Sequence, residues 1–186
     1  MIVDPRIQTV YNAELSLYKF LLNIIDQTLL LYSKKNNFAY SSRIKTIESI
    51  SEKIDTGRFK TWEEIDDKIA CTIIIPNQKY VEEVIDYLSK VFIKENIRKP
   101  TETFKDPTVF RFGSVIFVGK LRPINEEAPP MYSIPFEVQI KSAFEHAWSV
   151  ATHDLTYKSS EIEWKLLRLA STLKSNVEQL DMIILG

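Results

Sequence analysis

Cationic and hydroxyl side chains recur at regular spacing in the segment RIKTIESISEK, Arg43 to Lys53. In a helix over about 42–54, Lys45, Ser49 and Lys53 fall within an arc of roughly 80°, opposite the isoleucines of the same segment. Arg43 lies one residue before this turn. Two ammonium groups with a hydroxyl between them suit the oxygens of a polyphosphate, although a solvated lysine face has the same pattern.

Acidic side chains stand next to two apolar segments that are typical of buried strands. Asp66 and Asp67 come directly before KIACTIII, and Glu137 lies at the start of FEVQI. Mg²⁺ binds proteins through one or two carboxylates together with substrate phosphates. Each acid taken singly is also typical of a surface charge or a helix cap. Together with the cationic helix, the acids favour nucleoside triphosphate chemistry.

The elements that must position these residues follow from hydrophobic periodicity. We expect helices over about 6–34, 42–54, 80–91, 142–151 and 162–184, strands over about 68–75, 108–119 and 135–140, and a proline-rich loop over 120–133. These elements predict one α+β domain over 1–186, a mixed β-sheet flanked by helices. Its core spans about 40–160, with an N-terminal helix over 5–35 and a C-terminal helix over 162–184.

Composition narrows the classes of partner and location. The formal net charge of −1 provides no overall field that would attract nucleic acid or anionic lipid. Cys71 is the only cysteine and lies in an apolar run, so we expect it in the core. The chain has no apolar run long enough to span a bilayer and does not begin like a secretory signal. A cytoplasmic protein without a membrane partner is the expectation.

Three ordered motifs resemble those of the RelA/SpoT alarmone synthetases. Arg43 to Lys53 is similar to the helix motif R-x-K-x-x-x-S-x-x-x-K of that family, with all four marked positions present. DKIACTI resembles its metal-site strand D-x-x-[GA]-x-R through Asp67 and Ala70. FEVQIKSAFEHAWSVATHDLTYK is similar to the strand E-[IV]-Q-I-R-T and the helix after it. The matching positions in this last segment are Glu137, Gln139, Trp148, His153, Tyr157 and Lys158.

The resemblance implies a nucleotidyltransferase-like RelA/SpoT synthetase fold. It also implies Mg²⁺-dependent transfer of the β,γ-pyrophosphate of ATP to the ribose 3′-hydroxyl of GDP or GTP. Asp67 and Glu137 would bind the metal, and Glu137 could also deprotonate the attacking hydroxyl. The ATP phosphates would be held by Arg43, Lys45, Ser49 and Lys53. The acceptor would be held by Phe112, Ser114, Gln139, Lys141 and His153.

The chain departs from the family at positions that concern the acceptor. Thr72 stands where the metal-site strand carries arginine, and Lys141 replaces the arginine of Q-I-R, which keeps the charge without the fork. The acceptor motif G-Y-R-S-L-H has no clear copy. Phe112 and Ser114 can be laid over its Y-x-S, and a phenyl ring can stack on a base without donating a phenolic hydrogen bond.

Two other functions stay open on the sequence. One is toxin-type pyrophosphorylation of the tRNA 3′ end, favoured by a basic stretch from Lys94 to Arg122. The other is a degenerate nucleotide sensor without catalysis, favoured by Thr72 and the altered acceptor strand. With only two histidines, we expect no alarmone hydrolase activity. The amphipathic terminal helices could pack on their own sheet or form a homo-oligomer.

Overall fold

One mixed sheet organises the part of the chain that the computed structural model describes. The described residues are 3–57, 59, 61–99, 113–123, 129–157 and 164–186, without the side chains of 153–157. The strand order is β1-β2-β5-β4-β3. β2 and β5 pair in parallel, and the other neighbours pair antiparallel, which confirms the predicted mixed sheet. The strands are β1 (Ala39–Ile44), β2 (Ile69–Ile75), β3 (Ile93–Arg98), β4 (Val115–Lys120) and β5 (Phe136–Ser142).

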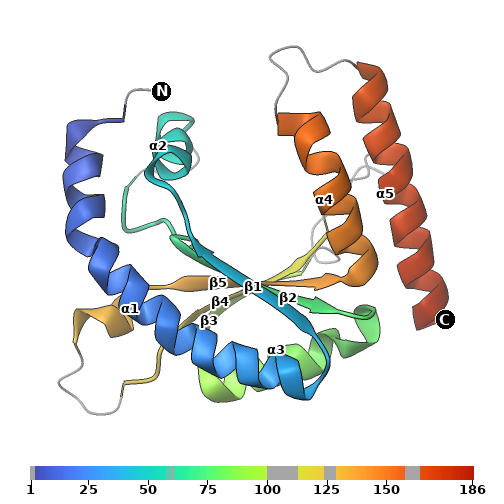
Figure 1. Ribbon diagram of the computed structural model, residues 1–186, viewed down its shortest axis with the longest axis horizontal. Helices are drawn as coiled ribbons and strands as arrows, with labels where there is room; N and C mark the ends of the chain where they lie inside the picture. Colours follow the sequence, from blue (N-terminus) through green and yellow to red (C-terminus); the bar gives the residue numbers. More distant parts are fainter. Residues whose placement is uncertain (1–2, 58, 60, 100–112, 124–128, 158–163) are drawn as a thin grey trace.

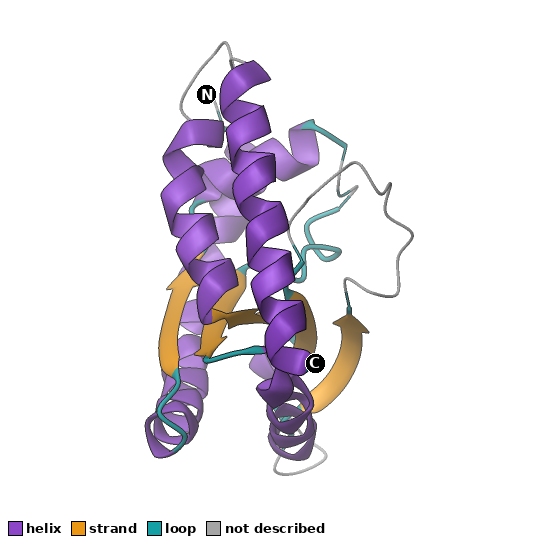
Figure 2. Cartoon of the chain, turned by 90° about the vertical axis from the view of Figure 1, so that its right-hand side faces the viewer, coloured by secondary structure: helices purple, strands orange, loops and turns teal. Residues whose placement is uncertain are grey.

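Helices cover both faces of the sheet. Figure 1 shows α1 and α3 on one side and α2, α4 and α5 on the other. Figure 2 shows α4 and α5 side by side along their length. The helices are α1 (Pro5–Lys35), α2 (Ile47–Asp55), α3 (Val81–Val91), α4 (Ala143–Tyr157) and α5 (Trp164–Leu185), with short 3-10 turns η1 (Gln78–Tyr80) and η3 (Pro130–Ser133).

The two faces of the central strands differ in chemistry because successive side chains of a strand point to opposite sides. On β2 and β5, alternate apolar residues are buried beneath α1 and α3. They are Cys71, Ile73, Ile75, Val138 and Ile140. The residues between them, such as Thr72 and Gln139, are only partly buried. The sheet therefore has one apolar face that forms the core and one face that can carry polar groups.

The predicted helix over 42–54 is wrong over 42–46. Residues up to Ile44 belong to β1, where Arg43 pairs with Ala70 of β2. The helix α2 begins only at Ile47, after Thr46, whose hydroxyl accepts a hydrogen bond from the Ser49 amide at 3.4 Å. A threonine N-cap favours a helix start at this point, and the edge strand before it satisfies its backbone through β2.

Two further predictions need correction. The edge strand β3 was not expected, since most of its side chains are exposed and it lacks an alternating apolar pattern. The strand predicted over 108–119 begins only at Val115 among the described residues, and 108–112 lie outside them. Edge strands are commonly short and polar, which removes the sequence signal for them.

The remaining helices lie where periodicity predicts them, and α4 extends six residues past its expected end, Ala151, to Tyr157. Trp148 of α4 is only half-buried, and its indole nitrogen donates to the Ala170 carbonyl of α5 at 2.9 Å. α5 also carries exposed apolar side chains, including Leu169 and Ile183. Self-association through the terminal helices stays a prediction. No helix in the described ranges combines the length and apolar character that a bilayer crossing requires.

Cys71 should serve as a reporter of unfolding. The residue is fully buried on β2, and burial raises the pKa of its thiol to about 12, so little thiolate forms near neutral pH. We expect a thiol reagent at pH 8 to label the native protein no faster than the protein unfolds. Labelling in increasing urea should follow the unfolding transition seen by circular dichroism. Rapid stoichiometric labelling of the native state would contradict the core position of Cys71.

Candidate active site

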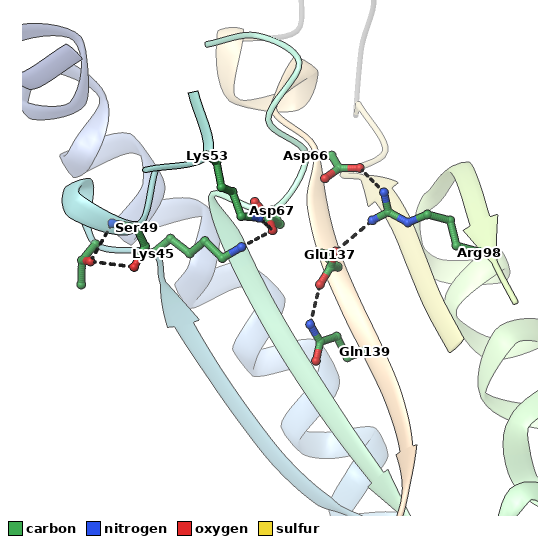
Figure 3. A network of polar contacts seen from close by, with 9 residues as sticks. Lys45, Ser49, Lys53, Asp66, Asp67, Arg98, Glu137 and Gln139 are labelled. Carbon is green, nitrogen blue, oxygen red and sulfur yellow. Dashed lines mark hydrogen bonds and ion pairs between the residues drawn. The ribbon is translucent and has the colours of Figure 1, made fainter. Parts of the chain in front are cut away.

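Two lysines from different elements converge on one carboxylate. Lys45 lies between β1 and α2, and Lys53 lies in the last turn of α2. The ammonium groups of both contact Oδ2 of Asp67, in the segment just before β2 (Figure 3). Two cations thus share one buried anion, which leaves an excess of positive charge that an anionic ligand would neutralise.

Three carboxylates gather beside this pair. One oxygen each from Asp66, Asp67 and Glu137 lies within 4.8 Å of the other two. Asp67 and Glu137 are buried, and Oδ1 of Asp67 has no hydrogen-bond partner among the described residues. Hard oxygen ligands at this spacing suit a divalent cation such as Mg²⁺. Oδ1 of Asp67 is buried without a hydrogen-bond partner among the described residues, so a cation bound by the three carboxylates would give it one.

Arg98 neutralises the acidic side of the site. Its guanidinium, from edge strand β3, donates to Oδ2 of Asp66 and to Oε2 of Glu137, both at 2.9 Å. Figure 3 shows Arg98 extending from β3 past β4 toward Glu137 of β5 and toward Asp66. Sequence reasoning placed Arg98 only within a basic stretch. A strand without apolar alternation gave no sign that its last residue points into the site.

A cavity of about 300 Å³ lies on the polar face of the sheet, between β1, β2, β5 and α4. Gln139 connects the cavity to the acids, since its amide donates to Oε1 of Glu137 at 2.6 Å. The strand β5 therefore presents an acid, an amide and an ammonium group on one face. The cavity walls include Arg43, Thr72, Gln139, Lys141, His146 and Ser149.

The helix α1 helps to fix the position of Lys45. The hydroxyl of Tyr11 donates to the Lys45 carbonyl at 3.0 Å, and the Lys45 amide donates to the Lys68 carbonyl at 2.9 Å. Both backbone groups of Lys45 are therefore satisfied by elements distant in the sequence. The side chain of Lys45 extends toward Asp67 from a fixed start, which lowers the entropy lost when it binds a ligand.

The charges of the lysine pair and its carboxylate are mutually adjusted. Burial opposes ionisation of Asp67, but hydrogen bonds from Lys45 and Lys53 outweigh it and hold the pKa of this carboxyl below its ordinary value. Burial lowers the pKa of Lys45 to about 8, and the like charge of Lys53 adds to this effect. An incoming phosphate would relieve the repulsion between the two ammonium groups.

The structure separates the residues that the sequence grouped together. Ser49 is exposed on α2, where its hydroxyl lies 3.2 Å from that of Thr46, whereas Lys45 and Lys53 contact Asp67. Arg43 lies on β1 and lines the cavity instead. Ser114, just before β4, is buried, and its hydroxyl has no partner in the described part of the chain. Phe112 and the side chain of His153 lie outside the described residues.

A scan against protein-family models matches residues 42–162 to the region found in RelA and SpoT proteins. The matched range contains the cationic, acidic and cavity residues described above. A search of curated proteins found no match to the sequence.

Solved structures share the fold over nearly the whole chain. Small alarmone synthetase 2 from Bacillus subtilis is 24% identical, with a TM-score of 0.76, and the likeness covers 95% of this chain and 96% of that one. Small alarmone synthetase 1 from the same organism is 19% identical, with a TM-score of 0.75, covering 94% and 93%. A GTP pyrophosphokinase family protein from Streptococcus pneumoniae is 19% identical, with a TM-score of 0.75, covering 95% and 92%.

The acidic group should bind a divalent cation without nucleotide. Glu137→Gln should weaken Mn²⁺ binding by about tenfold or more, because one anionic ligand is lost. Arg98→Gln should strengthen it, because the guanidinium no longer competes for the same oxygens. Isothermal titration calorimetry and the electron paramagnetic resonance signal of free Mn²⁺ measure the Mn²⁺ affinity of both variants.

The matched control for this titration is Glu95→Gln. Glu95 forms a surface ion pair with Lys120 at 3.0 Å, so its loss removes a carboxylate away from the acidic group. We expect its Mn²⁺ affinity to equal that of the wild type. Equal affinity in Glu137→Gln would show that Glu137 does not bind the cation.

Proposed function

Because the chain belongs to the RelA/SpoT family, we propose that it transfers the β,γ-pyrophosphate of ATP to the 3′-hydroxyl of GDP or GTP, making (p)ppGpp. The observation that carries the proposal is the meeting of Asp66, Asp67 and Glu137 within 4.8 Å, with two lysines on Asp67. Support also comes from small alarmone synthetase 1 of Bacillus subtilis, which has been solved bound to its product pppGpp and to AMPCPP.

The cationic side of the site is where we place the ATP phosphates. Lys45 and Lys53 carry more positive charge than Asp67 neutralises, and both are mostly buried, so a polyphosphate would meet strong, weakly screened charge. Arg43 lines the adjoining cavity from β1 and can contact the same nucleotide. Ser49, exposed on α2, contributes least in this arrangement.

The acidic side is where we place Mg²⁺. Asp67 and Glu137 would hold the cation, and Asp66 adds a third carboxylate at the same point. When bound, Mg²⁺ would neutralise charge on the phosphate oxygens during transfer. Arg98 contacts two of these carboxylates in the structure and would compete with the cation for their oxygens.

The acceptor belongs beside β5, where Gln139 and Lys141 face the cavity. In the proposed reaction the ribose 3′-oxygen attacks the β-phosphorus of ATP, the bond to the α-phosphate oxygen breaks, and AMP leaves. Glu137 would accept the proton of the 3′-hydroxyl. The bond from Gln139 fixes the Glu137 carboxylate, so its orientation is set before the acceptor binds.

Pyrophosphorylation of tRNA receives less support from the described residues. Its basis was the basic stretch from Lys94 to Arg122, yet several of these side chains have partners in the structure. Arg98 and Lys99 pair with acids, as does Lys120, and Arg122 donates to two backbone carbonyls. Side chains engaged in this way present less free charge to a phosphate backbone. We therefore favour a nucleotide as acceptor.

A nucleotide sensor without catalysis is the remaining alternative. Thr72 lines the cavity where the family carries arginine, which removes one guanidinium from its wall. The lysine pair and the acidic group are nevertheless complete, and buried carboxylates without a ligand to bind are costly to keep. The convergence of these groups favours an enzyme.

Glu137→Gln should abolish transfer without unfolding the protein. The amide keeps the shape and the neighbouring Gln139 while removing the metal-binding and proton-accepting charge, so the rate should fall by about 10²-fold or more. The assay uses ATP labelled at the γ-phosphate, Mg²⁺, and GDP, GTP or deacylated tRNA in separate reactions. Label in GDP or GTP supports the proposal, and label in tRNA alone supports the toxin-type activity.

Binding of ATP, measured in parallel, distinguishes an enzyme from a nucleotide sensor without catalysis. If no acceptor gains label while the wild-type protein binds ATP, the sensor alternative holds. Wild-type rates in Glu137→Gln would refute the catalytic role of this carboxylate.

The lysine pair and the serine should differ in their effect on ATP. Lys53→Met removes a charge-assisted contact and should raise KM for ATP by about ten- to a hundredfold. Lys45→Met should act in the same direction. Ser49→Ala, on the same helix, is the control and should stay within about twofold of the wild type. Initial rates at varied ATP measure all three, and an equal loss in Ser49→Ala would restore the single-face arrangement predicted from sequence.

A further inference from the structure

A buried ion pair connects α4 to α5 outside the groups discussed so far. Lys174 of α5 contacts Oε2 of Glu145 on α4, and their side chains are only 1% and 3% exposed. Removing two charges from water is expensive, and an apolar pair of similar size would often be at least as stable. Stability alone is therefore a weak explanation for this pair.

The second oxygen of Glu145 reaches the chain just before β4. Oε1 accepts a hydrogen bond from the Gly113 amide at 3.2 Å. The next residue is Ser114, whose buried hydroxyl has no partner among the described residues. Glu145 thus holds the backbone beside a buried hydroxyl whose hydrogen-bonding capacity is not used by the described residues.

Glu145 is itself firmly placed beside the cavity. Its backbone amide donates to the Ser142 hydroxyl at 3.1 Å, at the end of β5. Burial lowers the pKa of Lys141, and the Glu145 carboxylate works against that shift. The following residue, His146, lines the cavity. The carboxylate and the amide of Glu145 together therefore connect α5, the chain just before β4 and the end of β5.

We propose that Glu145 is a positioning residue for the acceptor. It holds the Gly113 amide with one oxygen, while Lys174 neutralises the other, and so fixes the location of Ser114 relative to Gln139 and Lys141. This inference rests on the proposed function and deepens it. It predicts that Glu145 affects binding of the acceptor and not binding of ATP. Glu145 does not touch the reacting atoms in this scheme.

The chain offers a control that loosens α5 without touching Gly113. Asp181 of α5 accepts a hydrogen bond from the Ser142 hydroxyl at 2.8 Å, and this contact is also buried. Asp181→Asn should weaken the docking of α5 while leaving the bond between Glu145 and Gly113 in place. If Glu145 only anchored α5, variants at Glu145 and at Asp181 would change the KM for the acceptor in the same way.

The test compares two double variants that differ in a single hydrogen-bond acceptor. E145Q/K174M keeps an amide oxygen for the Gly113 amide, and E145M/K174M does not. Neither leaves an unpaired buried charge, so both should fold. We expect E145M/K174M to show a KM for the acceptor about tenfold above that of E145Q/K174M, with KM for ATP within about twofold. Asp181→Asn should leave the acceptor KM unchanged.

Amide hydrogen exchange gives a readout that does not depend on the reaction. The Gly113 amide should be protected in the wild type and in E145Q/K174M, and should exchange faster in E145M/K174M. Equal protection of the Gly113 amide in the two double variants would overturn the proposal. So would a rise in KM that is the same for ATP and for the acceptor, or one that Asp181→Asn shares. If no variant or wild type transfers pyrophosphate, exchange alone still decides whether Glu145 holds Gly113, and the proposed function fails separately.

Discussion

The parallel pairing of β2 with β5 is the constraint on which the site depends. It sets Ala70 opposite Glu137 and so brings the segment before β2 to the start of β5, although about 70 residues separate them in the chain. Asp66 and Asp67 meet Glu137 for this reason. A shift of the register by one residue would turn Glu137 toward the apolar core and separate it from Asp66 and Asp67.

Around this pairing, each buried carboxylate of the site lies next to a cationic side chain. Three carboxylates face three cationic side chains, two on the side of α2 and one from β3. Positive charge is in excess around Asp67, and negative charge is in excess around Glu137, where one guanidinium serves two acids. A bound polyphosphate and a divalent cation would each replace a contact that the protein makes with itself, so the site is ordered before its ligands arrive.

The sequence predicted this arrangement unevenly, for physical reasons. Apolar periodicity located α1, α3, β2 and β5, because burial on one face leaves a pattern. It failed for β1 and β3, edge strands with exposed and polar side chains, and so it also missed Arg98. Motif spacing selected Lys45, Lys53, Asp67 and Glu137, which lie together in the structure, but Lys45 precedes α2, so the helical wheel that placed it on one face with Ser49 does not apply. Distances across the sheet cannot be obtained from spacing along the chain.

The central place of β5 has a consequence for how the protein is made. β5 is the last strand in the sequence, yet it lies between β2 and β4 and joins the two halves of the sheet. While a ribosome is still synthesising residues before Phe136, the inner edges of β2 and β4 lack a partner and resemble open edges that invite pairing with other chains. A nascent chain at that stage also lacks Glu137. Nucleotide chemistry and protection from aggregation should thus be gained in the same late step.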